Sequence, residues 1–487
     1  MPESKDARPS SQSRRGPSRE SVPSDTDPVI ARAANVIGGP LGRYAAMSRR
    51  PLGGTGARRH VPVPRWRPIA AALAACASLF VALGVVQKSY CFNHGWGGGE
   101  VFWHACYSDL PRVYVASGLV NGSFPYGPDS DGIAVPVGTG VVWWAISQFV
   151  PAGPDSTSWF VGLWAVVAAG LAAVLVVVTV LTCRRTPWQA AHIALSPLLI
   201  TLVLISGDLL GVVLVSVGLL LWSRERPLWA GVLLGAATAS RSYAVFAVIV
   251  LFVIALRAGR GRAATQMAGA TLLTWSVILM LAAIPAGTAV IAPYRTWLGA
   301  GAEFGAPAYL PELLGHPLPL GALTALAITG WILAILAGMA ATFLPAHRPR
   351  VAEVLIVVLV VVLLTSKAIP VQSSLWLVPL IALAGLRWRD HLPWVACELL
   401  YFMAVWLYLG GRVDPLRALP DQWYAGFLLL RCAGLTWLAV AAVRQAIARP
   451  AAPPMLSDDP LATAAEDPDE VAGPAAGRPD ALVVTFS

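Results

Sequence analysis

The chain has few charged residues. Of its 487 residues only 13% are charged, whereas soluble domains carry about 25%. Hydrophobic residues make up 56% of the sequence, and the mean hydropathy is +0.65. A water-soluble globular domain is therefore excluded. Because runs of about 20 apolar residues, the length of a membrane-spanning helix, recur along the chain, the sequence predicts an all-α polytopic membrane protein.

Several motifs are absent as well. No P-loop or Rossmann fingerprint stands out, which disfavours an ATP-driven transporter, and no convincing internal repeat is visible. His94, Glu100 and His104 do not have the spacing of a standard metal site, so we expect no metal and no other cofactor. The first apolar run starts near Ile69, too far from Met1 for a cleavable signal peptide. We therefore expect an uncleaved first helix.

The charge is concentrated at the two ends of the chain. Residues 1–67 hold 13 basic and 5 acidic residues, a net charge of +8, and the tail from Ala451 holds 1 basic and 7 acidic residues, a net charge of −6. Such segments cannot bury a core, so we expect a disordered basic tail over 1–67, a transmembrane domain over 68–445 and a disordered acidic tail over 446–487. The overall charge of +9 therefore does not indicate a nucleic-acid partner. A basic segment before a membrane helix is held on the cytoplasmic side.

Hydropathy predicts about 13 apolar segments separated by three longer polar loops. The segments are 68–87, 136–150, 159–182, 189–205, 208–223, 228–240, 243–256, 263–291, 319–344, 351–366, 373–387, 394–411 and 423–445, and the loops are 88–135, 292–318 and 412–422. Placing the clusters of Lys and Arg inside puts all three loops outside, with 88–135 as the first extracytoplasmic loop. The protein is then a multi-pass protein of the plasma membrane with a cytoplasmic N-terminus and an extracytoplasmic site.

One segment conflicts with this topology. Two apolar segments separate the first outer loop from the basic pair Arg184-Arg185, although an odd number of crossings is needed. Either segment 136–150 is re-entrant, or the basic pair breaks the charge rule. Segments 228–240 and 243–256 reach only about 20 Å as helices, less than a hydrocarbon core of roughly 30 Å. Such short helices need cover from protein or water, which predicts a cavity near the outer face.

Five ionisable residues fall on the predicted outer side of an otherwise apolar protein. Because a charge at membrane depth is costly, each is a candidate functional residue. Asp208 and Arg241 lie at the tips of two predicted hairpins, and Lys367 lies at the outer end of its helix. Arg431 lies roughly 12 Å inside the last helix, which predicts a partner acid or a bound anion.

Asp109 is the fifth and lies in the stretch "CYSDLPRVYVASGLVNGSFPYG". We expect a short amphipathic helix here that lies at the membrane surface. Ser108 or Asp109 could cap this helix, so Asp109 is either a cap or a general base that takes a proton from a hydroxyl. Asp208 is either a cap or an acid that binds an acceptor hydroxyl.

The basic candidates and the two loop cysteines also allow two interpretations each. Arg241 and Lys367 either extend their charges to the interface or clamp a phosphate group. Cys91 and Cys106 share the first outer loop, where a disulfide can form, but the sequence does not fix the distance between them.

The order of several motifs resembles glycosyltransferase family 87, a group of GT-C membrane glycosyltransferases of actinobacteria. The matching stretches are "YSDL" at Tyr107–Leu110, Gly118 to Tyr126, "SPLLITLVLISGDLLGVVLVSVGLLLW" from Ser196, "WAGVLLGAATASR" ending at Arg241, "QSSLWLVPLIALA" from Gln372 and "ELLYFMAVWLYL" from Glu398. Together they cover approximately residues 68–445. The chain departs from the family pattern at Ala134-Val135, at Gly207 and at Arg241.

The resemblance implies an inverting glycosyltransferase whose donor is a polyprenyl-phosphate sugar, usually mannose. Its acceptor would be a hydroxyl of a glycolipid or polysaccharide on the outer face, and membrane lipids would surround it. By this analogy Asp109 is the catalytic base. The substrate-binding residues would be Tyr107, Tyr126, Asp208, Arg241, Lys367, Gln372 and Arg431. Two alternatives stay open: a transporter or flippase of lipid-linked sugars, and a divergent non-catalytic member.

Overall fold

The computed structural model describes residues 66–127, 135–184, 186–345, 348–448 and 469–481, all within one compact unit, Trp66–Ser487. In these ranges the backbone forms helices and loops and no strand. The predicted all-α membrane fold is confirmed. Of the predicted basic tail, residues 1–65 lie outside the described residues, and the last two already belong to the first described helix.

Six helices in the described ranges are long and apolar enough to cross a membrane. They are α3 (Trp66–Gln87), α8 (Ser156–Thr182), α14 (Gly261–Ala286, continued to Gly299), α17 (Leu320–Phe343), α20 (Trp388–Gly410) and α21 (Asp421–Ala448). Large apolar side chains on α14 and α17 remain exposed, among them Leu273 and Ile284 on α14 and Ile332 on α17. Exposed apolar surface of this extent is typical of a face that contacts lipid.

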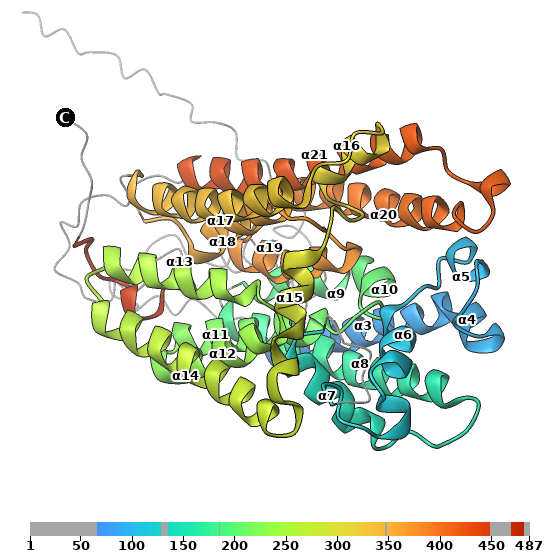
Figure 1. Cartoon of the computed structure of the whole chain (residues 1–487). Helices are drawn as coiled ribbons and strands as arrows, with labels where there is room; N and C mark the ends of the chain where they lie inside the picture. Colours follow the sequence, from blue (N-terminus) through green and yellow to red (C-terminus); the bar gives the residue numbers. More distant parts are fainter. Residues whose placement is uncertain (1–65, 128–134, 185, 346–347, 449–468, 482–487) are drawn as a thin grey trace, which may run out of the picture. The chain divides into compact units, whose positions relative to one another are not determined.

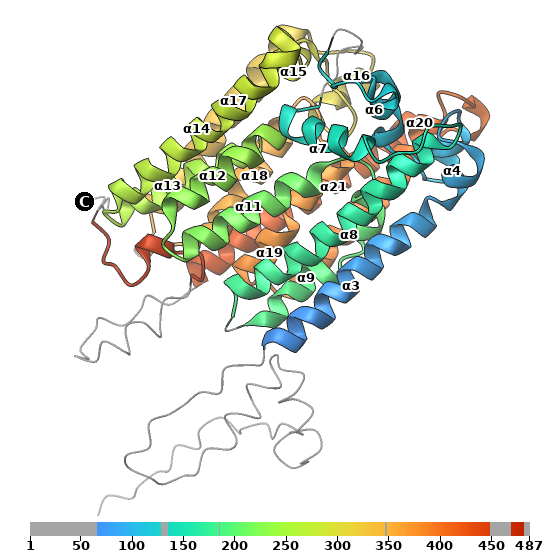
Figure 2. The same cartoon turned by 90° about the horizontal axis from the view of Figure 1, so that it is seen from below.

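Five shorter helices complete the bundle: α7 (Val137–Ser147), α11 (Asp208–Ser223), α12 (Pro227–Ser240), α13 (Ala244–Arg257) and α18 (Val351–Thr365). Helices α3, α8, α11, α12 and α14 pack successively side by side, and α17, α18, α21 and α20 form a second series (Figures 1 and 2). Helix α13 packs on both α14 and α18 and so joins the two. Helix α18 is apolar and buried over most of its surface, as expected for a helix that is hydrophobic all round.

Two broken segments lie between these series. The first consists of η3 (Pro187–Ala190), α9 (Ala191–Ala194) and α10 (Leu198–Leu202), and the second of η6 (Val371–Trp376) and α19 (Val378–Ala384). Prolines at 197, 370 and 379 cannot donate a backbone hydrogen bond, which interrupts the helices. The segments pack on each other through α9 and α19. The second is buried throughout, and most residues of the first are buried, although Leu195 is exposed. Irregular backbone at membrane depth is tolerated when protein covers it in this way.

The length of helix α7 helps to decide whether segment 136–150 spans the membrane or is re-entrant. Its 11 residues reach only about 16 Å, which is shorter than a hydrocarbon core of about 30 Å. It packs against α8, α12 and α14 near the helices of the first loop (Figure 2). The length of α7 therefore favours the re-entrant interpretation of segment 136–150.

The first long loop is helical, as predicted. It contains α4 (Ser89–His94), α5 (Glu100–Trp103), α6 (Asp109–Ala116) and η2 (Leu119–Asn121). The second loop contains η4 (Gly287–Ile291), α15 (Ala292–Gly299), η5 (Pro307–Tyr309) and α16 (Leu310–Leu313), and the third contains η7 (Pro415–Arg417). The first and third loops meet, since Arg417 Nη1 lies 3.8 Å from Glu100 Oε1.

The basic clusters gather at the opposite end of the bundle from α6. Arg184 lies over the ring of Trp66, where α3 begins, and Arg224 donates to the Leu181 carbonyl at the end of α8. Arg257 and Arg348 both pair with Asp480. We call this the Asp480 end, and the end with α6 the Asp109 end. The basic clusters that we predicted to lie together on the cytoplasmic side are thus found together at one end of the helix bundle.

The C-terminal region differs from the sequence prediction. We expected disorder over 446–487, yet residues 469–481 are packed on the bundle and include η8 (Gly473–Ala475). For these residues the prediction is wrong, because Val471, Ala472 and Ala475 bury apolar side chains and Asp480 pairs with two arginines. Residues 449–468 and 482–487 lie outside the described residues.

Candidate active site

At the start of helix α6, Ser108 caps the helix and the neighbouring Asp109 does not. Ser108 is the N-cap: its backbone is extended, and its Oγ accepts from the amide of Leu110. The same Oγ donates to the Leu204 carbonyl at 2.7 Å, which fixes the cap to the first broken segment. Since Ser108 satisfies the helix end, the carboxylate of Asp109 is free of the capping role that the sequence left open for it.

The carboxylate of Asp109 is held from one side by an aromatic hydroxyl. Tyr107 donates to Asp109 Oδ1 at 3.0 Å, and the Asp109 amide donates to the Ile205 carbonyl at 2.9 Å. In the described part of the chain, no Lys or Arg nitrogen forms an ion pair with Asp109. Burial raises the pKa of Asp109, while the bond from Tyr107 and the charge of Arg241 act in the opposite direction. A carboxylate with a raised pKa is better able to take up a proton near neutral pH.

A compact polar group lies beside Asp109 at the start of α11. Asp208 Oδ2 is 2.8 Å from Arg241 Nη2, and Trp376 Nε1 donates to Asp208 Oδ1 at 3.0 Å. Ser206 Oγ also donates to Asp208 Oδ2, at 2.5 Å. Gly207 at the N-cap makes no side-chain cap, so Asp208 is held mainly by these three donors. The side chain of Arg241 is 28% exposed and is thus accessible to a ligand.

A buried lysine supports the backbone that carries Asp109. Lys88 follows α3 directly, is 0% exposed, and donates from Nζ to the carbonyls of Tyr107 at 2.8 Å and Cys106 at 3.4 Å. Burial lowers the pKa of Lys88 to about 7, and the nearby charge of Asp109 partly opposes this. The sequence reading missed Lys88 because a lysine at the end of a membrane helix normally extends to water.

The disulfide between Cys91 and Cys106 is formed, with the Cα atoms 5.9 Å apart. It joins α4 to the residue directly before Tyr107. Together with Lys88 it connects the end of the first membrane helix to the "YSDL" motif at two points. The other four cysteines, Cys76, Cys183, Cys397 and Cys432, are free.

Two further charged residues near Asp109 were not singled out in the sequence. Arg112 lies close enough to lower the pKa of Asp109, although burial dominates that shift. Its position three residues after Asp109 places both on one face of α6, a signal that the sequence already contained. Glu303 lies in the second loop, and burial first and the charge of Asp109 second raise its pKa. No local pattern marked Glu303, since a loop between distant helices brings it there.

The ammonium group of Lys367 binds backbone carbonyls at the end of α15. Its Nζ donates to the carbonyls of Trp297, Leu298 and Ala300 at 3.0 to 3.2 Å and lies over the ring of Trp297. A cation at the carboxyl end of a helix is favourably placed with respect to the helix dipole, and these carbonyls belong to the end of α15. The Lys367 carbonyl in turn accepts from the amide of Glu303 at 2.8 Å, so Lys367 supports the loop that carries this acid.

Arg431 has the partner acid that its depth predicted. Its Nε lies 3.0 Å from Glu398 Oε2, and both side chains are almost fully buried. The guanidinium also donates to the carbonyls of Ile369 and Pro370 and to Ser374 Oγ. Arg431 therefore fixes the start of the second broken segment, with its donors already occupied.

The remaining two candidates lie apart from these contacts. Tyr126 donates to the Val135 carbonyl at 2.7 Å and packs against Gly140 of α7, where a Cβ would meet the Tyr126 hydroxyl. It belongs to a small apolar cluster with Val137 and Ala282. Gln372 is buried within η6.

An apolar pocket adjoins the Asp208–Arg241 pair. Tyr243, directly after the Arg241 turn, packs edge-on against Trp376, and the pocket continues between α11, α13, α18 and α19 past Val212, Ala247, Leu355 and Leu380. The accessible volume of this cavity is only about 20 Å³, so it is a gap in the packing and is too small for a substrate. Among the described residues, no group of three His, Cys, Asp or Glu side chains could hold a metal ion.

Comparison with known proteins gives one match. Residues 137–366 match the family model of glycosyltransferase family 87, a region that includes Asp208, Arg241 and Glu303. No curated protein and no solved structure matches the chain. The "YSDL" motif lies before the matched region, yet its Asp109 lies in electrostatic contact with Asp208 and Arg241 inside it. The matched region is therefore similar to glycosyltransferase family 87, the family that the order of the motifs resembles, and it lies in a chain with six helices, among the described residues, that are long and apolar enough to cross a membrane.

Proposed function

We propose that this membrane glycosyltransferase moves a hexose, with mannose as the expected sugar, from a polyprenyl-phosphate donor to a hydroxyl of a glycolipid or polysaccharide. The transfer takes place at the Asp109 end of the bundle, which faces away from the cytoplasm. The basic clusters at the Asp480 end support this orientation, because Lys and Arg are enriched in cytoplasmic loops. A formed Cys91–Cys106 disulfide supports it too, since disulfides persist in oxidising compartments.

The observation that carries the proposal is the carboxylate of Asp109. It is relieved of capping by Ser108, held by Tyr107, and shifted by burial towards a higher pKa. In the proposed step Asp109 accepts the proton of the acceptor hydroxyl while that oxygen attacks the anomeric carbon. The bond from this carbon to the phosphate oxygen breaks, and polyprenyl phosphate leaves with the bonding electrons. Attack opposite the leaving group inverts the anomeric centre.

The other residues divide between charge stabilisation and positioning. Arg241 is partly exposed beside Asp109 and can stabilise the negative charge that develops on the leaving phosphate, as preorganised donors do in other enzymes. Arg112 is a second cation for that charge. Asp208 orients Arg241, and Glu303 offers an acceptor for hydroxyls of the sugar.

The direct test is Asp109→Asn. Membranes containing each variant are incubated with radiolabelled polyprenyl-phosphate-mannose, and label in the acceptor fraction is measured. We expect transfer to fall about 10²- to 10⁴-fold, the range for loss of a general base, with donor binding retained. Asp155→Asn is the matched control, because Asp155 is exposed at the start of α8 and makes no side-chain cap. Full transfer by Asp109→Asn would remove the base assignment.

One observation favours the alternative of a flippase. Discontinuous helices such as the two broken segments are common in transporters, and here both lie between the two series of helices, with the second buried throughout. Reconstituted vesicles separate the two functions. Label that crosses the membrane while still attached to the polyprenyl phosphate indicates translocation, whereas label moved to a new hydroxyl indicates transfer.

A further inference from the structure

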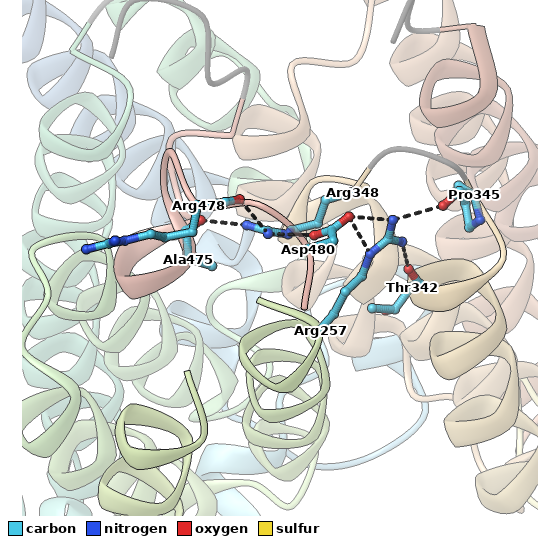
Figure 3. A network of polar contacts seen from close by, with 7 residues as sticks. All are labelled: Arg257, Thr342, Pro345, Arg348, Ala475, Arg478 and Asp480. Atoms are coloured by element: carbon cyan, nitrogen blue, oxygen red, sulfur yellow. Dashed lines mark hydrogen bonds and ion pairs between the residues drawn. The ribbon is translucent and has the colours of Figure 1, made fainter. Parts of the chain in front are cut away.

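The segment 469–481, which we call the clasp, lies on the Asp480 end of the bundle (Figure 3). It follows α21 after an interval of residues 449–468. It contacts the ends of α11 and α13 and the start of α18, which are distant from it in sequence. The clasp therefore resembles a bound peptide more than a continuation of the last helix.

Asp480 is the central contact of the clasp. Its Oδ2 is 2.7 Å from Arg257 Nη2, and its Oδ1 is 2.6 Å from Arg348 Nη2. The Nε atoms of both arginines donate to the same carboxylate, at 2.8 Å from Arg257 and 2.9 Å from Arg348. Charge-assisted bonds from planar guanidinium groups are among the strongest and most geometrically specific in proteins.

The carboxylate of Asp480 is the counterion of Arg257. Arg257 is 0% exposed at the end of α13, and its guanidinium also donates to the carbonyls of Thr342, in the last turn of α17, and Pro345, just after α17. Carbonyls satisfy hydrogen bonds but supply no full negative charge. Without Asp480 the guanidinium would be a buried charge with no counterion, which is strongly unfavourable. The helices thus leave a cationic position that an acidic group from the clasp fills.

Three further contacts fix the register of the clasp. Asp469 Oδ2 accepts from the amide of Val351 at the first turn of α18, where the helix dipole favours an anion. Gly473 has φ +53° and lies so close to the Trp222 carbonyl that a Cβ would be 2.3 Å from that oxygen. The Arg348 guanidinium donates to the backbone carbonyls of Ala475 and Arg478, and the Ala481 amide donates to the Arg257 carbonyl.

The clasp is held by acidic side chains near both of its ends, by a glycine position that has no room for a side chain, and by hydrogen bonds to its backbone. Peptide-binding sites recognise their ligands through contacts of these kinds. We propose that the ends of α11, α13, α17 and α18 form a peptide-binding groove whose ligand is the chain's own clasp, and that the groove binds this segment when it is supplied as a separate peptide. In the intact chain the interval 449–468 tethers the ligand and keeps its effective concentration high. This proposal does not depend on the reaction at the Asp109 end.

The test uses a chain that ends at residue 468, purified in detergent, and a fluorescent synthetic peptide of residues 469–487. Fluorescence anisotropy should show saturable binding to the shortened chain and at least tenfold weaker binding to the full-length chain, whose groove is occupied. A peptide with Asp480→Asn should bind at least tenfold more weakly than the native peptide. Arg478→Gln is the matched control, since the Arg478 side chain is exposed and its backbone carbonyl is the group that accepts from Arg348.

Equal affinity of the Asp480→Asn and native peptides, or no saturable binding to a folded shortened chain, would overturn the proposal. The full-length protein provides a second measurement should the shortened chain fail to fold. Hydrogen exchange at the Val351 and Ala481 amides should be at least tenfold faster in full-length Asp480→Asn than in Arg478→Gln, because both amides are bonded across the groove. Unchanged exchange at both amides contradicts the clasp.

Discussion

Helix α13 runs between two clusters of acids and arginines that differ in how completely their charges are matched. At the Asp480 end, one carboxylate receives four donors from Arg257 and Arg348, and Arg257 is fully buried. At the Asp109 end, Asp208 is matched by Arg241, but Asp109 receives one side-chain hydrogen bond, from Tyr107. The matched cluster is expected to stabilise the fold, whereas the unmatched acid retains the capacity to react.

The difference between the two clusters shows that a buried charge can either stabilise the fold or be kept reactive. Burial raises the free energy of a charged group, and a counterion with good geometry offsets that cost. Where the counterion is absent the pKa shifts instead, as it does for Asp109 and Lys88. Perturbed pKa values concentrate at functional sites. The lack of a direct ion pair to Asp109 in the described part of the chain is therefore the feature that distinguishes the candidate site.

The strongest effect on stability is expected at a third, fully matched pair. Glu398→Gln leaves Arg431 as an uncompensated charge in the bundle, which should cost about 3–5 kcal/mol. Thermal unfolding in detergent measures this, with Glu312→Gln on the exposed α16 as the control. A double variant, Glu398→Gln with Arg431→Met, should recover part of the loss. An unchanged midpoint for Glu398→Gln would show that matched pairs do not dominate stability here.

The disulfide at the Asp109 end is expected to contribute about 3 kcal/mol, the value for a loop of roughly 15 residues. Replacing Cys91 and Cys106 with alanine should lower the unfolding midpoint and also reduce transfer, because the bond adjoins Tyr107. Replacing the free Cys76 with alanine is the control. Lower stability with normal transfer would mean that Lys88 alone positions the motif.

Lys88 should make stability depend on pH. Its pKa in the folded protein is about 7, below its ordinary value of about 10.4, so the unfolded chain binds the proton more tightly between these values. Stability should therefore rise with pH from about 7 to about 10 and be lost as pH falls towards 7. Lys88→Met should flatten this dependence, whereas Arg295→Met, at an exposed position on α15, should not. If the stability of Lys88→Met rose with pH as steeply as that of the native protein, the pKa assigned to the buried Lys88 would be wrong.

The smallest effect is expected from Tyr107→Phe, which removes one hydrogen bond to a carboxylate, worth about 1.5–3 kcal/mol. Because that bond lowers the pKa of Asp109, its loss should raise the pKa further and move the acidic limb of the transfer rate to higher pH. The pH profile of transfer measures this, with Tyr90→Phe as the control. A limb that moves to lower pH would contradict the assignment of Asp109 as the group that titrates.

The apolar segments could be read from the sequence because hydropathy is local. Each predicted segment corresponds to a helix or a broken helical segment, and Asp208 and Arg241 begin and end helices as expected. The capping question could not be settled, since both Ser108 and Asp109 suit an N-cap, and the choice depends on the distant Leu204 carbonyl.

Residues that act over long sequence separations were missed for the same reason. Lys88 is buried only because the loop folds back over α3 with its disulfide. The composition around Asp480 is typical of disorder, yet its partners lie 223 and 132 positions away in the chain. Composition averages over a segment and does not register such specific long-range contacts.

The comparison between the two clusters is tested most directly by measuring the unfolding midpoint and the transfer rate for Asp109→Asn and Asp480→Asn side by side. Asp109→Asn should lower transfer about 10²- to 10⁴-fold. It should also raise the unfolding midpoint at pH values where Asp109 is ionised, because the raised pKa of this buried carboxyl means that its ionisation costs stability as pH rises. Asp480→Asn should lower the midpoint and leave transfer per folded molecule unchanged. Transfer retained in Asp109→Asn, or lost per folded molecule in Asp480→Asn alone, would contradict the account.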